Sequence, residues 1–170
     1  RIHYEDTDIG GIVYHTKYLN FIESARSSLI RLLGFPSEKF LKLNQSIVVK
    51  NINISWYSPC SLGDCIFVKT NLIELKNASL CLQQVIFNEE NNKKLASAYV
   101  KLCFVNEKMK VIKLPEKFSS CLATFSLISI FFSGLILTAR SKFVSSTTFS
   151  NSNEITVKSG GSFLPKFGRP

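Results

Sequence analysis

The sequence predicts one α+β domain in which a long helix packs on an antiparallel sheet. Apolar residues recur at three- and four-residue steps over residues 16–33, which indicates an amphipathic helix. Beyond residue 45 the apolar residues alternate with polar ones, which is typical of half-buried strands. Short polar turns separate these segments and favour antiparallel neighbours. A helix and a sheet of this kind bury their apolar faces against each other in two layers.

The elements are expected in the order strand, helix, then four or five strands. Residues 1–5 are expected to be the end of a strand, and the helix over 16–33 is expected to end at Gly34 and Pro36. The later strands are expected at residues 46–56, 65–75, 78–88 and 94–106, with a short edge strand at 109–114. Residues 1–118 therefore form the expected folded domain.

The chain after residue 118 differs in composition from this domain. The run from Ser119 to Ala139 has 21 residues and no charged side chain, within an apolar segment that we place at 119–142. This length just suffices to span a bilayer, so the segment is either a membrane helix or a tail foreign to the domain. Residues 143–170 are rich in Ser, Thr and Asn, and we expect them to be disordered.

Composition excludes some partners and sites. The net charge of +9 comes from Lys and Arg scattered along the chain, so we expect no nucleic-acid partner. The five cysteines have no metal-ligand spacing and no paired His, so we expect no metal and no Cys nucleophile. They are expected to be reduced, as in a cytosolic protein. Because the chain begins with Arg1, we expect the natural N-terminus to be missing.

The first eighteen residues, RIHYEDTDIGGIVYHTKY, gather groups that suit acyl-group hydrolysis. Asp8 precedes the Gly10-Gly11 pair, and His15 stands where the helix begins. The first amides of a helix lack helical partners and can stabilise a carbonyl oxygen that becomes negative. A nearby carboxylate can attack that carbonyl or activate a water molecule. The alternative is that Asp8 only caps the loop and His15 is an ordinary helix residue.

The same stretch resembles the signature of the 4-hydroxybenzoyl-CoA thioesterase family, in particular its Tol-Pal-associated acyl-CoA thioesterase branch. The matching residues are YEDTD-x-GG-x-VYH-x-x-Y, followed by F-x-E-x-AR and an LG pair. Weaker similarities continue through Tyr57-Ser58-Pro59, Gly63-Asp64 and the final KMKVIKLPEKF. The resemblance covers about residues 1–118 and leaves out the tail.

This resemblance implies a hotdog fold, with a long central helix wrapped by an antiparallel sheet. It implies homodimers joined edge to edge, often paired into homotetramers, with active sites at the subunit interface. It further implies hydrolysis of acyl-CoA thioesters without a metal or other cofactor. Carried over by position, Asp8 is the catalytic carboxylate, His15 lies by the thioester carbonyl and offers its N–H, and Tyr4 is a further active-site residue. Asp6 is expected to be structural.

The sequence leaves alternatives for the acyl pocket, for Arg26 and for the function. Ile9 stands where the family usually has Ala or Pro, so the acyl pocket is expected to differ in shape. Arg26 is either scaffold or a ligand for a carboxylate or a coenzyme phosphate. The alternative function is a non-catalytic hotdog module that binds acyl carrier protein or a membrane-associated envelope complex. We expect a cytoplasmic protein, with the apolar segment as a candidate contact with the inner membrane.

Overall fold

The computed structural model describes residues 1–131, 135–140, 149–151 and 155–158, with side chains as far as residue 124. A 3-10 turn over Tyr4–Asp6 precedes the long helix α1, Lys17–Leu32, and the short helix α2, Ser37–Leu41. The remaining elements are β1 (Gln45–Trp56), β2 (Ile66–Leu75), β3 (Ser79–Asn88), β4 (Lys94–Asn106), α3 (Glu116–Phe131), β5 (Leu135–Arg140), β6 (Phe149–Asn151) and β7 (Ile155–Lys158).

The four long strands form the sheet that the sequence predicts. Their order is β1-β4-β3-β2, each pair is antiparallel, and the sheet continues through β7, β5 and β6. Because β1 pairs only with β4 among the described strands, one side of β1 is an open sheet edge. The predicted bounds of α1 and of β1 to β4 agree with the structure to within one residue.

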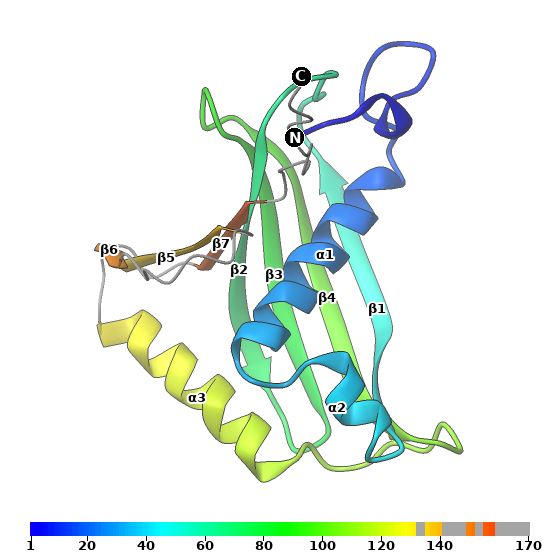
Figure 1. Cartoon of the computed structure of the whole chain (residues 1–170), viewed down its shortest axis with the longest axis vertical. Helices are drawn as coiled ribbons and strands as arrows, with labels where there is room; N and C mark the ends of the chain where they lie inside the picture. Colours follow the sequence, from blue (N-terminus) through cyan, green and yellow to red (C-terminus); the bar gives the residue numbers. More distant parts are fainter. Residues whose placement is uncertain (132–134, 141–148, 152–154, 159–170) are drawn as a thin grey trace, which may run out of the picture.

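Helix α1 covers one face of this sheet (Figure 1). Its apolar stripe is buried, with Ile22 and Leu29 almost fully inaccessible. Strand β4 contributes the small buried residues Ala96 and Ala98. These residues and the stripe of the helix belong to one hydrophobic core.

A buried glutamine ties α1 to the middle of the sheet. Gln84 on β3 donates a hydrogen bond from Nε2 to the carbonyl oxygen of Ile22 at 3.0 Å. The same nitrogen donates to Oγ1 of Thr70 on β2 at 3.1 Å. Both side chains are buried, so these bonds fix the position of the helix along the sheet.

An aromatic cluster closes the end of the sheet that lies beside α2. The rings of Phe35, Phe40, Phe104 and Phe118 pack with centroid separations of 5.0 to 5.9 Å. Figure 1 places α2 at the opposite end of α1 from the N-terminal loop. The sequence did not predict α2, because five residues are too few to show a helical period.

Two predicted strands are wrong. Residues 1–5 do not form a strand, because the Asp6 carboxylate accepts the N–H of His3 and closes the 3-10 turn. Residues 109–114 contribute only an isolated bridge between Val105 and Val111. A tight turn occupies this place, since Met109 has a positive φ of 57° and the Asn106 side chain accepts two backbone N–H groups.

The chain after residue 118 is described in part. Helix α3 reaches Phe131, residues 132–134 lie outside the described residues, and β5 follows. None of the described helices combines the length and the apolar character needed to cross a bilayer. Most of residues 143–170, which we expect to be disordered, lie outside the described residues. Only β6 and β7 are described in this range. The assignments of 119–142 and 143–170 therefore stay predictions.

Candidate active site

A narrow loop immediately before α1 carries the predicted site. Thr7 and Val13 form an antiparallel bridge, and the N–H of Asp8 donates to the carbonyl of Ile12 at 3.0 Å. Gly11 has a φ of +73°, which lets the chain reverse at the tip. The glycine pair thus makes the turn that the sequence indicates.

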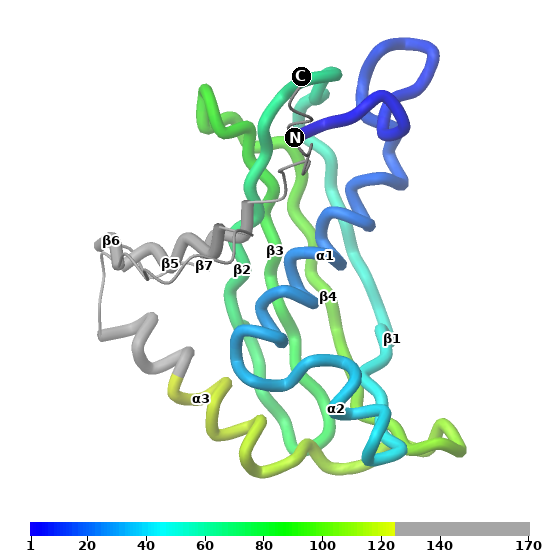
Figure 2. Tube along the Cα trace, viewed as in Figure 1, coloured from blue at the N-terminus to red at the C-terminus, as the bar shows by residue number. Residues whose placement is uncertain are grey.

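The loop is fastened to the connection between β1 and β2. The N–H of Val13 donates to the carbonyl of Cys60 at 2.8 Å, and Ile12 forms a bridge with Ser61. The N–H of Ile2 donates to the carbonyl of Asp64 at 2.8 Å. The loop therefore lies at the same end of the molecule as this connection, away from α2, as the trace in Figure 2 shows.

A buried thiol and a carboxylate hold the connection itself. The Asp64 carboxylate accepts the Cys60 thiol at 3.3 Å and the N–H of Ser61 at 2.9 Å. Burial, with help from Asp64, raises the pKa of the Cys60 thiol to about 12. Burial also raises the pKa of Tyr18, in the first turn of α1, to about 12. At neutral pH Cys60 is thus a protonated structural thiol.

Asp8 presents an exposed carboxylate near the tip of the loop. Its Oδ1 accepts the N–H of Gly10 at 2.8 Å. A Cβ atom at residue 10 would lie only 3.0 Å from that oxygen, so a larger residue there would displace the carboxylate by a few tenths of an ångström. Within the described residues Oδ2 has no hydrogen-bond partner and can accept one from a ligand.

His15 lies where α1 begins, and its ring lies between two aromatic residues. The ring centroids are 4.4 Å from Tyr14 and 6.2 Å from Trp56. Thr16 at the N-cap makes no side-chain hydrogen bond to the helix. Among the described residues, the amides of His15 and Thr16 donate no hydrogen bond. The positive end of the helix therefore offers free donors beside an exposed imidazole.

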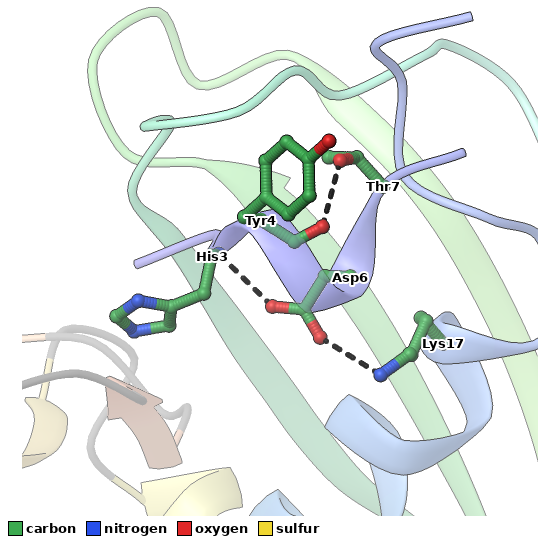
Figure 3. Close-up of polar contacts among 5 residues, drawn as sticks. All are labelled: His3, Tyr4, Asp6, Thr7 and Lys17. Carbon is green, nitrogen blue, oxygen red and sulfur yellow. Dashed lines mark hydrogen bonds and ion pairs between the residues drawn. The ribbon is translucent and has the colours of Figure 1, made fainter. Parts of the chain in front are cut away.

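Asp6 is the carboxylate that lies alongside the helix start (Figure 3). Its Oδ2 accepts the N–H of His3 at 3.0 Å, and its Oδ1 lies 3.4 Å from Nζ of Lys17. The backbone pairing sets Asp6 opposite Tyr14, whose N–H donates to the Asp6 carbonyl at 2.9 Å. Asp6 is nearly buried and its oxygens are occupied, as a structural role requires.

Tyr4 projects from the 3-10 turn toward solvent. Its side chain is exposed, and only its carbonyl is occupied, accepting the hydroxyl of Thr7 at 2.9 Å (Figure 3). Among the described residues, no hydrogen bond or ring contact joins the side chains of Tyr4, Asp8 and His15. The fold brings the three onto one loop and leaves each side chain open to a ligand.

Sequence reasoning missed two neighbours of this loop. Trp56 was not assigned to the site, yet it is 46% exposed in a single copy and its ring centroid lies 6.2 Å from that of His15. Lys17 was not singled out, although it pairs with Asp6. The signal that could have indicated Trp56 was its position at the end of an alternating strand.

Within the part of the chain that is described, no three His, Cys, Asp or Glu side chains gather closely enough to hold a metal ion.

Comparison with known proteins identifies the family. The Thioesterase superfamily model matches residues 10–94. The acyl-CoA thioesterase YbgC of Haemophilus influenzae is 37% identical over 119 residues, which cover 69% of this chain and 86% of that protein. The acyl-CoA thioester hydrolase YbgC of Escherichia coli O157:H7 is 33% identical over 116 residues, covering 68% and 87%.

Solved structures of thioesterases are also similar to this chain. A probable thioesterase from Bartonella henselae is 30% identical, with a TM-score of 0.64 over 68% of this chain and 94% of that one. BH1999 gentisyl-coenzyme A thioesterase is 23% identical and shares the fold, with a TM-score of 0.66 over 72% and 95%. These likenesses confirm the predicted hotdog fold and give no support to the non-catalytic alternative. The chain belongs to the thioesterase superfamily and is similar over most of its length to the YbgC acyl-CoA thioesterases.

Proposed function

We propose that this chain hydrolyses acyl-CoA thioesters to a free acid and coenzyme A. The observation that carries the proposal is the Asp8 carboxylate, which is exposed on a loop that leads directly into the free amides at the start of α1. The named activities of the relatives support the same reaction.

The residues of the loop divide the chemistry between them. The N–H of His15 stabilises the oxygen of the thioester carbonyl as it becomes negative. Asp8 either takes a proton from the attacking water or attacks the carbonyl carbon itself, forming an anhydride that water then opens. In both routes the carbon–sulfur bond breaks and the coenzyme leaves as a thiolate. Tyr4 and the ring of His15 contact the substrate around this centre.

Replacing the carboxylate by an amide tests the assignment. Asp8→Asn removes the base or nucleophile while keeping the shape, so kcat is expected to fall on the order of 10²- to 10⁴-fold. Thiol release from acyl-CoA is followed with a chromogenic disulfide. Glu5→Gln is the matched control, since Glu5 is an exposed carboxylate of the adjacent turn. Full activity in Asp8→Asn, or an equal loss in both variants, would contradict the role of Asp8.

The two routes differ in where water oxygen first enters. If an anhydride forms and water opens it at the aspartyl carbonyl, single-turnover hydrolysis in oxygen-18 water labels the Asp8 carboxylate. If Asp8 is a base, the label enters only the released acid. Mass spectrometry of the peptide that contains Asp8 separates the two outcomes.

We further propose that the active form is a homodimer joined at β1, paired again into a homotetramer. Support comes from the open edge of β1 among the described strands, and from the Asp8 Oδ2 atom, which has no hydrogen-bond partner within the described residues. A second copy at this edge would complete the walls of the site.

Placing a charge on the open edge tests this assembly. Val49 is an exposed β1 residue beside a bulge, and Val49→Lys is expected to weaken the dimer about tenfold through like charges on facing strands. Ile73→Lys, beside the bulge of β2, is the control. Molar mass is measured by light scattering against concentration. Equal masses for the two variants at every concentration would rule out the β1 edge.

Our proposal for the cellular compartment and the partners of the enzyme is based on the family resemblance. We propose a cytoplasmic enzyme associated with the Tol-Pal envelope system, with acyl carrier protein as a partner that presents acyl groups. Fractionation of cells tests the compartment, and recovery in a membrane fraction that resists extraction with salt and alkali would contradict it. Comparing acyl-CoA with the same acyl group on acyl carrier protein tests the partner.

A further inference from the structure

A pocket lies between α1, α2 and β1, at the other end of α1 from the candidate active site. Its volume is about 200 Å³. The polar side chains that line it are Glu23, Arg26, Ser27, Ser37, Gln45 and Ser46. Arg26 follows Lys17 by nine residues, which is about 13 Å along the helix axis. The pocket is therefore separate from the start of α1 in the same copy.

Arg26 is a buried cation without an adequate partner. Its side chain is 6% exposed, and its Nη1 has no hydrogen-bond partner among the described residues. The ion pair found for it joins Nη2 to Oε1 of Glu23 at 3.7 Å, and that carboxylate is 69% exposed. Burial lowers the pKa of Arg26 from its usual value, while Glu23 raises it. A buried charge of this kind is unfavourable unless another group accepts its free N–H bonds.

The wall formed by β1 also has an unsatisfied polar group. Oε1 of Gln45 is buried and has no partner within the described residues. Rotation of its carboxamide by half a turn presents Nε2 in its place. The serine hydroxyls of the same pocket can donate as well. The guanidinium thus has neutral donors on the side of β1, while the exposed Glu23 carboxylate lies 3.7 Å from its Nη2. A guanidinium whose Nη1 is free can bind a carboxylate or phosphate there together with these donors.

We propose that this pocket binds an oxyanion carried by the substrate, with the Arg26 guanidinium and the Gln45 carboxamide as its donors. The proposal rests on the proposed acyl-CoA hydrolysis and adds a determinant of substrate choice to it. Two parts of an acyl-CoA ester carry such an oxyanion. One is a carboxylate at the far end of a dicarboxylic acyl group, and the other is the 3′-phosphate of the coenzyme.

The decisive variant is Gln45→Glu, which places a carboxylate in the pocket. This carboxylate is expected to pair with Arg26, to preserve or raise the melting temperature, and to exclude an external oxyanion. Asn91→Asp adds the same charge in the turn between β3 and β4 and serves as the control. Arg26→Lys keeps the charge but loses the planar fork, and it shows whether the guanidinium geometry is needed.

The kinetic test uses the whole chain and two pairs of substrates. Dicarboxylyl-CoA esters of four to ten carbons are compared with monocarboxylyl-CoA esters of the same length. In parallel, acyl-CoA esters are compared with the corresponding acyl-3′-dephospho-CoA esters. In one of the two comparisons, we expect the wild type and Asn91→Asp to prefer the substrate that carries the extra oxyanion by at least tenfold in kcat/KM. That substrate is either the dicarboxylyl ester or the ester with the 3′-phosphate. The preference is expected to disappear in Gln45→Glu and to shrink in Arg26→Lys.

Each outcome has a definite meaning. A preference for the dicarboxylyl esters assigns the pocket to the acyl end, and a preference for the 3′-phosphate assigns it to the coenzyme. Equal kcat/KM values within both pairs, or a preference that Gln45→Glu retains, would overturn the proposal that the pocket binds an oxyanion. Neither result would contradict thioester hydrolysis itself. Failure to hydrolyse any of these acyl-CoA esters, dicarboxylyl or monocarboxylyl, would instead overturn the proposed function. In that case, calorimetric titration with coenzyme A and with free dicarboxylic acids of four to ten carbons, in wild type and Gln45→Glu, tests the pocket directly. Equal heats in the two proteins for every ligand would overturn the proposal.

Discussion

The Asp8 carboxylate is held in place by the backbone of the residue two positions later. Its Oδ1 accepts the N–H of Gly10 at 2.8 Å, and a Cβ atom at residue 10 would lie 3.0 Å from the same oxygen. Gly10→Ala is therefore expected to push the carboxylate aside and to lower kcat/KM about 10- to 100-fold. Because the loop is exposed, the melting temperature is expected to change little. Steady-state kinetics and thermal melts measure the two effects.

Gly11→Ala provides the matched control for this variant. Gly11 has a positive φ, but a Cβ atom there would meet nothing within 4 Å. This change is expected to cost about 1 kcal/mol of backbone strain without touching Asp8. Equal losses of kcat/KM in the two alanine variants would mean that turn strain, and not contact with the carboxylate, controls activity.

At the residue scale, the sequence could predict which side chains share the loop but not which of them have partners. Spacing placed Asp8 and His15 within one short segment, and the family resemblance added Tyr4. The difference between the two Asp residues depends on the pairing across the loop, which sets Asp6 by the helix start and Lys17. Nη1 of Arg26 has no partner among the described residues because of the way α1, α2 and β1 pack together. A local sequence pattern cannot predict this.

At the element scale, periodic burial decides what sequence reasoning can predict. Helix α1 and strands β1 to β4 are long enough to repeat their pattern, and their bounds were predicted to within one residue. The segments at 1–5 and 109–114 were wrong because side-chain bonds from Asp6 and Asn106 close turns there. Such bonds compete with strand pairing in short segments.

The connection between β1 and β2 is expected to make the fold sensitive to alkaline pH. The pKa of the Cys60 thiol is raised from 9.0 to about 12 in the folded chain, so the folded state keeps a proton that the unfolded state loses. Stability is therefore complete below about pH 9 and falls as pH rises toward 12. The expected loss of unfolding free energy by pH 10.5 is on the order of 1–3 kcal/mol.

Urea unfolding at pH 8 and pH 10.5, with a reductant present, measures this loss. Cys60→Ala removes the thiol, so most of the difference between the two pH values is expected to disappear, although the variant is less stable at pH 8. The remaining pH dependence reflects Tyr18, whose pKa is also raised to about 12. An undiminished difference in Cys60→Ala would show that the thiol does not control the alkaline limit.

At the scale of the whole molecule, the core extends beyond the predicted boundary at residue 118. Phe118 is fully buried among Phe35, Phe40 and Phe104, and Leu122 is 2% exposed. The first two turns of α3 therefore complete the aromatic cluster at the end of the sheet. Composition suggested a boundary here because charged residues cease, but burial depends on contacts from distant parts of the chain.

Truncation at two points tests where the folding unit ends. A chain of residues 1–115 lacks α3 and exposes the apolar surface that Phe118 and Leu122 cover. Deleting buried side chains of this kind costs about 3–5 kcal/mol for Phe and 2–5 for Leu, which together approach the whole stability of a typical domain. A chain of residues 1–131 keeps both contacts and is expected to unfold cooperatively. Calorimetry of the two chains, with Phe118→Ala in the full chain as an independent measure, decides the point. Matching melting temperatures for 1–115 and 1–131 would place α3 outside the folding unit.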